Sequence, residues 1–268
     1  MAENIAATSG LIREAAENGA DLIMTPEMTS LMELGRTNLF AQIKPQDEDP
    51  ALEAFRALAA ELGRWLLVGS LAIRTSEARA ANRSFLIAPD GSIAASYDKL
   101  HMFDVDLAGG ESYRESASYA AGSEAVTADL PWGRLGLTVC YDLRFPQLYR
   151  ALARQGACFL AIPSAFTRKT GEAHWHVLVR ARAIENGCFV FAPAQGGTHE
   201  NGRETYGHSL IVSPWGEILA EAATEPGVIY ADVDPAAVDQ ARQRIPALRH
   251  DRAFSVRDTA PAGVRQAS

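Results

Sequence analysis

Residues 133–156 read GRLGLTVCYDLRFPQLYRALARQG, and this stretch decides the fold. Its first seven residues have the apolar character of a buried strand, and Cys140 comes where that strand stops. An amphipathic helix is expected to follow over residues 146–155. A buried strand that leads through a sharp turn into a helix is a building unit of α/β proteins, so we expect this class of fold.

Strands and helices alternate in the same way on both sides of this stretch. Periodicity and stop signals predict helices over residues 3–18, 51–62 and 172–186. Apolar runs predict strands over 21–24, 65–72, 158–163, 188–194 and 227–233, and turn residues predict hairpins over 84–97 and 207–222. This alternation implies sheets covered by helices. We see no linker or internal repeat and expect one domain over residues 1–250, with a polar, extended tail over 251–268.

The net charge and the apolar content of the chain argue against nucleic-acid and membrane partners. The 268 residues carry a net charge of −8, which argues against nucleic acid because a phosphate backbone favours a basic face. No apolar run approaches the roughly 20 residues of a membrane helix, and the first residues show no secretory signal, so no membrane partner is expected. The three cysteines, Cys140, Cys158 and Cys188, are an odd and widely spaced set, a poor disulfide framework. A cytoplasmic protein fits these features.

Cys140 is the first candidate for chemistry. A thiol at the start of a helix is stabilised as thiolate by the partial positive charge of the helix N-terminus. The backbone N–H of Tyr141 would then face an oxyanion formed on an attacked carbonyl. The alternative is a packed core cysteine, because free cysteine is among the most buried residue types. For Cys158 and Cys188, which lie inside apolar strands, we retain that alternative.

Two charged residues also follow apolar strands. Lys99 comes just after the hairpin over 84–97, and Glu27 comes after the strand over 21–24. Taken singly, each is by default a solvent-exposed side chain. Strand ends converge on the ligand crevice of open α/β sheets, however, and this analogy would bring both residues to Cys140. A carboxylate base, an ammonium group that stabilises an oxyanion and lowers the pKa of the thiol, and a thiol nucleophile form a complete acyl-transfer set.

Five separated segments, taken in order along the chain, resemble the nitrilase superfamily of carbon–nitrogen hydrolases. They are LIMTPE (22–27), YDKLHMFD (97–104), VCYDLRFP (139–146), HWHVLVRARAIEN (174–186) and YGHSLIVSPWGE (206–217). The resemblance implies a single-domain, four-layer αββα sandwich that pairs with a second copy. It also implies that Glu27 is the base, Lys99 the family's lysine and Cys140 the nucleophile of an amidase. Glu115 falls where the family has a second glutamate, and neither a metal nor a cofactor is implied.

The resemblance also narrows the substrate to a small carboxamide that is cleaved through a cysteine thioester. Nitrile hydrolysers of this superfamily typically carry Trp-Glu after the nucleophile, whereas this chain has Tyr141 and Asp142. CYDLRFP, with PSAF at 163–166 and RARAIEN, looks most like the deaminated-glutathione amidases and nearly as much like the ω-amidases that act on α-ketoglutaramate. An N-carbamoyl amidohydrolase is a further alternative. Both favoured substrates are 2-oxo acids, so a cationic pocket group is expected; Arg144 and Arg168 are candidates, although Arg144 could equally tie down the turn.

Other interpretations stay open. A non-catalytic scaffold could retain this fold, and a transferase could resolve the thioester with an amine instead of water. His174 and His176 are two residues apart on a helix, so they face different sides and make a poor metal pair. Arg180, Arg182 and Glu185 are expected to form pairs on the helix surface rather than a nucleic-acid patch.

The N-terminus departs from the family pattern. Members usually begin with an apolar strand ahead of the first helix, whereas this chain begins directly at that helix. The missing strand would be an interior one, so its absence would leave sheet edges unpaired. We expect a start codon placed too late, or a truncated sequence, to explain the difference.

Overall fold

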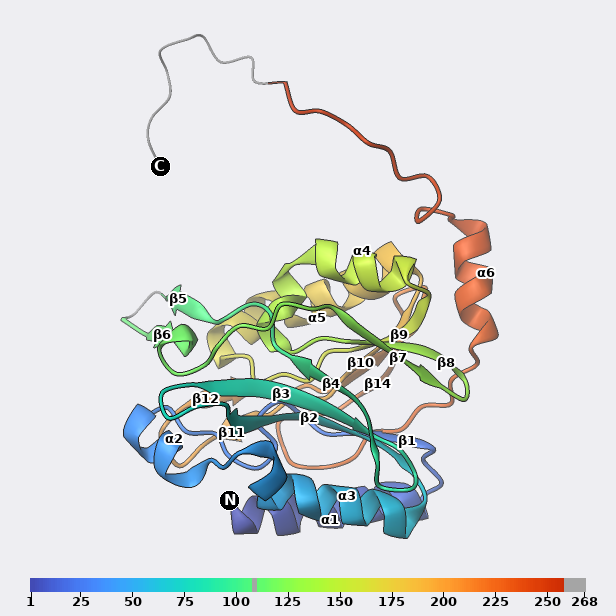
Figure 1. The fold of residues 1–268 in the computed structure, drawn as a ribbon. Helices are drawn as coiled ribbons and strands as arrows, with labels where there is room; N and C mark the ends of the chain where they lie inside the picture. The colour runs from blue at the N-terminus through green and yellow to red at the C-terminus, as the bar shows by residue number, and fades with distance from the viewer. Residues whose placement is uncertain (108–109, 258–268) are drawn as a thin grey trace, which may run out of the picture.

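The protein has four layers in this computed structural model, which describes residues 1–107 and 110–257 (Figure 1). Helices α1 (Ala2–Glu17) and α3 (Pro50–Leu62) form one outer layer, and α4 (Pro146–Arg154) and α5 (Arg168–Asn186) form the other. Two sheets lie between these layers. The predicted α/β fold, a four-layer αββα sandwich, is therefore confirmed. Two further helices, α2 (Arg36–Gln42) and α6 (Ala236–Arg244), lie outside the layers.

The first sheet has the strand order β1-β2-β3-β4. Its strands are β1 (Leu22–Met24), β2 (Trp65–Arg74), β3 (Ala80–Ile87) and β4 (Ile93–Asp98). Successive side chains of β2 pack into two different hydrophobic cores, because side chains alternate between the two faces of a strand. Leu66 and Val68 pack with the buried residues of α1 and α3, whereas Leu67 packs toward the second sheet. Burial on both faces explains the continuous apolar run that predicted this strand.

The second sheet has the order β14-β13-β10-β9-β8-β7. Its strands are β7 (Val126–Leu130), β8 (Gly133–Leu137), β9 (Ala157–Ala161), β10 (Phe189–Ala192), β13 (Leu210–Val212) and β14 (Ile218–Glu221). β8, β9 and β10 are parallel to one another, so their carboxyl ends lie at one edge. Two small ribbons, β5 (Asp104–Asp106) with β6 (Ser112–Arg114) and β11 (Gly196–Thr198) with β12 (Glu204–Tyr206), and three short 3-10 helices, η1 (Gln46–Glu48), η2 (Glu115–Ala117) and η3 (Cys140–Arg144), complete the fold.

Local signals explain where α3 begins and ends. The Asp49 carboxylate accepts hydrogen bonds from the N–H groups of Ala51 and Leu52, and Pro50 occupies the first turn. Gly63 closes the helix with a φ of 61°, a conformation that glycine adopts without strain. Helix limits in this region could therefore be predicted from single residues.

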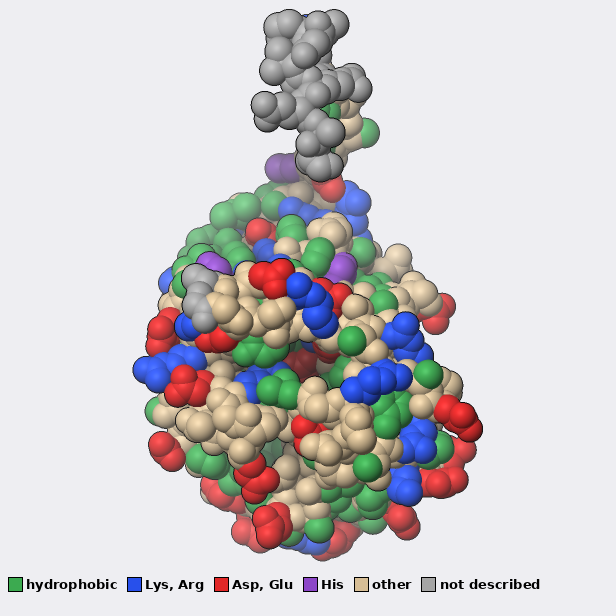
Figure 2. All heavy atoms as spheres, turned by 90° about the vertical axis from the view of Figure 1, so that its left-hand side faces the viewer, with side chains coloured by type: hydrophobic (Ala, Val, Ile, Leu, Met, Phe, Trp, Pro, Cys, Tyr) green, Lys and Arg blue, Asp and Glu red, His purple; other side chains and the backbone are tan. Residues whose placement is uncertain are grey.

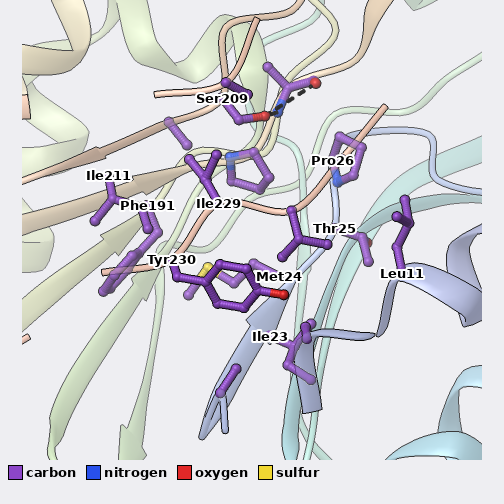
Figure 3. Close-up of a pocket in the computed structure, with 18 of the residues that line it drawn as sticks. Leu11, Ile23, Met24, Thr25, Pro26, Phe191, Ser209, Ile211, Ile229 and Tyr230 are labelled. Carbon is purple, nitrogen blue, oxygen red and sulfur yellow. Dashed lines mark hydrogen bonds between the residues drawn. The ribbon is translucent and has the colours of Figure 1, made fainter. Parts of the chain in front are cut away.

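One edge of the first sheet borders a cavity rather than another strand. Among the described strands, β1 pairs only with β2. The cavity of about 990 Å³ is lined by α1, by β1 and by residues 225–234 (Figure 3). The strand predicted over 227–233 is not formed, so that prediction was wrong. A strand needs a neighbour for its N–H and C=O groups, and here Met24, Ile229 and Tyr230 line the cavity and residues 227–233 form no strand pairing (Figure 3).

The last described residues belong to the tail predicted over residues 251–268. Residues 251–257 are exposed and contain neither helix nor strand, and residues 258–268 lie outside the described part of the chain. Within the described residues, none of the helices combines the length and hydrophobicity needed to span a bilayer.

Candidate active site

Glu27, Lys99 and Cys140 each lie just beyond the end of a strand, following β1, β4 and β8 respectively. One parallel and two antiparallel pairings relate β1 to β4, so both strands run in the same direction and end at the same edge. The three residues are almost fully buried, with exposed fractions of 4%, 2% and 5%. Because buried glutamate and lysine are rare unless paired, this burial calls for partners.

The Lys99 ammonium group is the centre of a charge network. Its Nζ lies 3.0 Å from Glu27 Oε1 and 2.8 Å from Glu115 Oε2. The Asn82 side-chain amide donates to both carboxylates, at 2.8 Å and 3.0 Å. The Phe103 N–H donates to Glu115 at 2.7 Å. Two carboxylates and one cation are thus held in fixed positions by neutral donors.

A close approach of two backbone segments positions Glu27. β2 interrupts its regular pairing with β3 between Val68 and Leu71, and Gly69 lies in this interruption. A Cβ atom on Gly69 would lie 2.0 Å from the Thr25 carbonyl oxygen, so a larger residue would push the loop away. The Gly69 N–H instead donates to Thr25 Oγ1 at 3.0 Å. Glycine here lets the loop after β1 carry Glu27 across β2.

Cys140 occupies a strained turn. Its φ of 49° lies in the left-handed region, which non-glycine residues rarely adopt away from functional sites. Its N–H donates to the Pro163 carbonyl oxygen at 2.9 Å, and its sulfur accepts a hydrogen bond from the Ala165 N–H. The buried Asp142 carboxylate accepts from the Val139 N–H at 2.9 Å. The sulfur is therefore held among fixed hydrogen-bonding groups.

Asp142 also joins this turn to the loop beyond Lys99. Its Oδ1 accepts from the His101 N–H at 3.1 Å and lies 2.7 Å from Nδ1 of the same residue. The Tyr97 hydroxyl donates to Oδ2 at 2.7 Å. A single buried carboxylate thus sets the spacing between the lysine loop and the cysteine turn.

The local charges determine which groups are ionised. Burial alone would raise the pKa of Glu27, but the charge of Lys99 and hydrogen bonds from Cys140 and Lys99 leave that pKa below its usual value. Burial alone would lower the pKa of Lys99, but the Glu115 and Glu27 carboxylates raise it well above its usual value. Burial and the negative charge of Glu27 raise the pKa of Cys140. At neutral pH the site therefore holds a carboxylate, an ammonium group and a neutral thiol.

The raised pKa of Cys140 corrects an expectation drawn from the sequence. A helix N-terminus and Lys99 were expected to stabilise a thiolate. Cys140 instead begins the short 3-10 helix η3, and α4 starts only at Pro146. Beside the Glu27 carboxylate, burial of a second anion costs more than Lys99 offsets. The thiol hydrogen-bonds to Glu27 instead, an arrangement that suits base-assisted attack.

Tyr141 and Arg144 lie on the outer side of the nucleophile turn. The Tyr141 ring packs edge-on against Phe103 at 5.2 Å, and its backbone N–H follows the nucleophile directly. The Arg144 guanidinium lies 5.3 Å from the centre of the Phe166 ring and 3.3 Å from His174 Nδ1. These contacts hold the side chain beside the turn, and both roles considered for Arg144 stay predictions.

Arg168 and Arg182 both have partners other than the catalytic candidates. Arg168 is exposed and forms ion pairs with Glu172 at 3.0 Å and Glu204 at 3.5 Å, so its charge already has partners. The expected pairing of Arg182 with Glu185 is present, at 3.0 Å between Nη1 and Oε2, but the expected surface position of Arg182 was wrong, because this residue is only 4% exposed. Its Nε and Nη2 donate to the Leu143 carbonyl oxygen at 3.0 Å and 2.7 Å, and this contact supports η3 from α5.

Arg203 reaches the site without any signal in the sequence. Its Nη2 donates to the Ala165 carbonyl oxygen at 2.6 Å, and its guanidinium lies 5.5 Å from the centre of the Tyr113 ring. Its positive charge contributes to the lowered pKa of Glu27. Asn82, which hydrogen-bonds to Glu27, was missed as well, because neither residue follows a recognisable strand end or motif. Only their contacts in three dimensions identify them.

Within the described residues, one group has the composition of a cation site. The ligand atoms of His176, His208 and Glu221 lie within 4.8 Å of one another. Glu221 Oε1 lies 2.9 Å from His176 Nε2 and 2.9 Å from His208 Nδ1, so hydrogen bonds satisfy these groups without an ion. His174 contacts Arg144 instead, in agreement with its position on another side of α5.

Helix α2 and strands β5 and β6 lie at one end of the molecule (Figure 1). Figure 2 shows this end, which is hollowed near its centre, and acidic side-chain atoms are visible in the depth of the hollow. Lys and Arg side chains lie near the opening.

The chain is similar to several known proteins. The model of the carbon–nitrogen hydrolase family matches residues 1–243. The deaminated glutathione amidase of Synechocystis sp. is 40% identical over 256 residues, and the match covers 93% of each chain. The crystal structure of the Caenorhabditis elegans NitFhit protein is 37% identical with a TM-score of 0.86, and the match covers 93% of this chain and 61% of that one. A mutant amidase from Nesterenkonia sp. AN1, which shows Michael addition of acrylamide at its active-site cysteine, is 26% identical with a TM-score of 0.76, over 91% of this chain and 92% of that one.

Proposed function

The chain belongs to the carbon–nitrogen hydrolase family, and from this premise we propose that it is an amidase that cleaves a small carboxamide through a thioester on Cys140. One observation carries the proposal. The Glu27 carboxylate contacts both the Lys99 ammonium group, at 3.0 Å, and the Cys140 thiol, in a buried site. Base, cation and nucleophile are the three groups that acyl transfer requires.

Attack on the amide begins with the neutral thiol. Glu27 takes the proton of Cys140 as the sulfur–carbon bond forms, and the carbonyl oxygen becomes an oxyanion. Lys99 and the Tyr141 N–H stabilise this oxyanion, a role worth roughly 3–4 kcal/mol per donor in comparable sites. Glu115 keeps Lys99 charged and in place through its 2.8 Å contact.

The intermediate then collapses and the carbon–nitrogen bond breaks. Glu27 returns its proton to the departing ammonia or amine, which leaves a thioester on Cys140. The same carboxylate next takes a proton from water as the hydroxide adds to the thioester carbon. Collapse of this second intermediate releases the carboxylic acid, and the sulfur recovers its proton from Glu27. The overall reaction consumes one amide and one water.

A variant series tests this assignment. Cys140→Ser is expected to abolish amide hydrolysis while the melting temperature stays within a few degrees, because serine is close to cysteine in size. Cys158→Ser, which changes a partly exposed cysteine elsewhere, is the matched control and should retain activity. Full activity in Cys140→Ser would end the proposal. Wild-type protein that turns over no amide at all would favour the non-catalytic scaffold.

The proposed substrate is deaminated glutathione or a related 2-oxo acid amide. The name and 40% identity of the Synechocystis relative support this choice. ω-Amidase activity on α-ketoglutaramate and hydrolysis of an N-carbamoyl amino acid are the alternatives. Rates for all three substrates, measured side by side, rank them. Repeating the assay with a competing amine such as hydroxylamine distinguishes hydrolysis from acyl transfer.

The proposed setting is a homodimer in the cytoplasm. The free state of Cys140, Cys158 and Cys188 supports a reducing compartment. Large apolar side chains are exposed on α5 and on the neighbouring β13–β14 hairpin: Val177 (70%), Ile184 (53%), Trp215 (50%) and Leu219 (41%). Such a patch supports contact with a second copy. Sedimentation should show a dimer that Val177→Glu weakens; a wild-type monomer would contradict this.

A further inference from the structure

Three side chains from separate elements meet beside α5. His176 lies on this helix, His208 lies between β12 and β13, and Glu221 is the last residue of β14. Their ligand atoms all lie within 4.8 Å of one another. His174, which precedes His176 by two residues, contacts Arg144 instead. The helix therefore contributes one histidine to the group, and the other two members come from distant parts of the sequence.

The distances within this group are close to those between neighbouring ligands of one metal ion. Glu221 Oε1 lies 2.9 Å from His176 Nε2 and 2.9 Å from His208 Nδ1. Zinc bonds to imidazole nitrogen and carboxylate oxygen of about 2.1 Å place neighbouring ligand atoms roughly 3.0–3.4 Å apart. Small side-chain rotations would therefore let the three atoms share an ion. Two imidazoles and a carboxylate are also the donors of zinc sites that have three protein ligands and a water.

Aromatic packing and a backbone hydrogen bond orient the two imidazole rings. The Tyr206 ring stacks on the His208 ring, with centroids 4.4 Å apart, and meets the His176 ring edge-on at 5.9 Å. Trp175 Nε1–H donates to the His208 carbonyl oxygen at 2.7 Å, which fixes the backbone at this histidine. Because the rings are already oriented, they lose little conformational entropy when an ion binds.

The group is accessible to an ion and carries the charge that a cation needs. The three side chains are half-buried, with exposed fractions between 28% and 37%, so an ion can reach them from solvent. Burial alone would raise the pKa of Glu221, but hydrogen bonds from His176 and His208 leave that pKa below its usual value. Glu221 is therefore a carboxylate at neutral pH, the form that binds a metal ion.

From this geometry we infer that His176, His208 and Glu221 bind a divalent metal ion of the zinc class, which ties α5 to the β13–β14 hairpin. Imidazole nitrogens suit zinc, whereas magnesium and calcium prefer oxygen ligands. The ion takes the place of the two N–H protons that join the histidines to Glu221, and each neutral imidazole then carries its proton on the other ring nitrogen. None of the three ligands belongs to the proposed amidase site, so the inference does not rest on that activity.

Calorimetric titration with ZnCl2 tests the inference in Cys140→Ser, which lacks the thiol of the amidase site as a competing ligand. We expect one zinc ion to bind per chain. Glu221→Gln keeps an oxygen that accepts from the imidazoles but removes the charged ligand. Its zinc affinity should fall by at least about 100-fold, because residues that only hydrogen-bond to a metal ligand are already worth roughly 10- to 100-fold. His176→Gln should weaken binding to the same extent.

His250→Ala is the matched control, because it removes an exposed histidine that does not belong to the group. It should bind zinc as the parent protein does, and all variants should keep the circular dichroism of the parent. Zinc affinity that is unchanged in both Glu221→Gln and His176→Gln would show that the ion binds elsewhere, and the inference would be overturned. Cys140→Ser protein that binds no zinc, or that binds MgCl2 equally well, would overturn it as well.

A crystal of the wild-type protein soaked in ZnCl2 gives a test that needs no variant. An anomalous peak is expected about 2.1 Å from His176 Nε2, His208 Nδ1 and a Glu221 carboxylate oxygen. Zinc peaks at other residues, with none at this group, would contradict the inference even if every variant failed to fold.

Discussion

Gly69→Ala adds one methyl group at the point where β2 passes beneath the loop that carries Glu27. The new Cβ would lie 2.0 Å from the Thr25 carbonyl oxygen, 2.4 Å from the Pro26 carbonyl oxygen and 2.6 Å from Pro163 Cβ. Carbon and oxygen atoms in contact are normally about 3.3 Å apart or more. The loop must therefore move by about 1 Å, and backbone atoms cannot rotate away as a flexible side chain would.

The displacement reaches two of the three catalytic candidates. The loop over Thr25 and Pro26 leads directly to Glu27, and the Pro163 carbonyl accepts the hydrogen bond of the Cys140 N–H. A misplacement of about 1 Å can reduce a rate about 100-fold. Overpacking of this kind also destabilises a protein by about 1–3 kcal/mol. Gly69→Ala is therefore expected to lose most of its activity while it remains folded.

The assay compares kcat with the free energy of unfolding in urea for the same preparation. Gly10→Ala is the matched control, because a Cβ at Gly10 meets no atom within 4 Å and should leave activity unchanged. A Gly69→Ala variant with activity within threefold of wild type and unchanged stability would refute the account of how Glu27 is positioned. Loss of folding alone would be seen as a missing urea transition, and circular dichroism would identify it.

Four further results are expected from the charges and hydrogen bonds of the site. Lys99→Met should abolish activity and cost about 3–5 kcal/mol of stability in urea, because it leaves the buried Glu27 and the half-buried Glu115 without their cation; Lys44→Met, at an exposed site, should change neither. The pKa of Glu27 is lowered, so its active carboxylate form is lost only as the pH falls through this lowered pKa. The kcat/KM profile should therefore stay level through neutral pH and fall only below pH 4.5, the usual pKa of glutamate. An acid limb near pH 6 would contradict this. The pKa of Cys140 is raised, so alkylation by iodoacetamide should keep accelerating above pH 9, and a plateau reached by pH 7 would indicate a preformed thiolate. Asp142→Asn should lower kcat more than it raises KM, because it loosens the link between the lysine loop and the cysteine turn; an unchanged kcat would show that this link is dispensable.

Sequence patterns predicted the parts of this structure that depend on neighbours along the chain. The side chains of Leu66, Leu67 and Val68 point alternately into two cores, because their strand is buried on both faces. The continuous apolar run of this strand predicted it from the sequence. Lys99 and Cys140 follow strands whose ends could be located to within a few residues. The convergence of the ends of β1 and β4 follows from the directions of these strands, which the strand pairings determine.

Features that depend on contacts between distant segments could not be predicted in this way. The segment over 227–233 has a strand-like sequence, but a cavity lies where its partner would be, so it forms no ladder. Arg203 lies in a turn between β11 and β12, and only its hydrogen bond to Ala165 shows that it lies near the site. The protonation of Cys140 depends on burial beside Glu27, which residue type and spacing do not reveal.

Capture of the acyl-enzyme tests the central mechanism most directly. Wild-type protein is mixed with excess α-ketoglutaramate or deaminated glutathione, quenched in acid within one turnover and digested for mass spectrometry. We predict that the peptide bearing Cys140 carries the acyl group of the substrate, and that hydroxylamine removes it as it removes any thioester. Steady turnover with unmodified Cys140 at every quench time, or with the acyl group on another residue, would contradict the account.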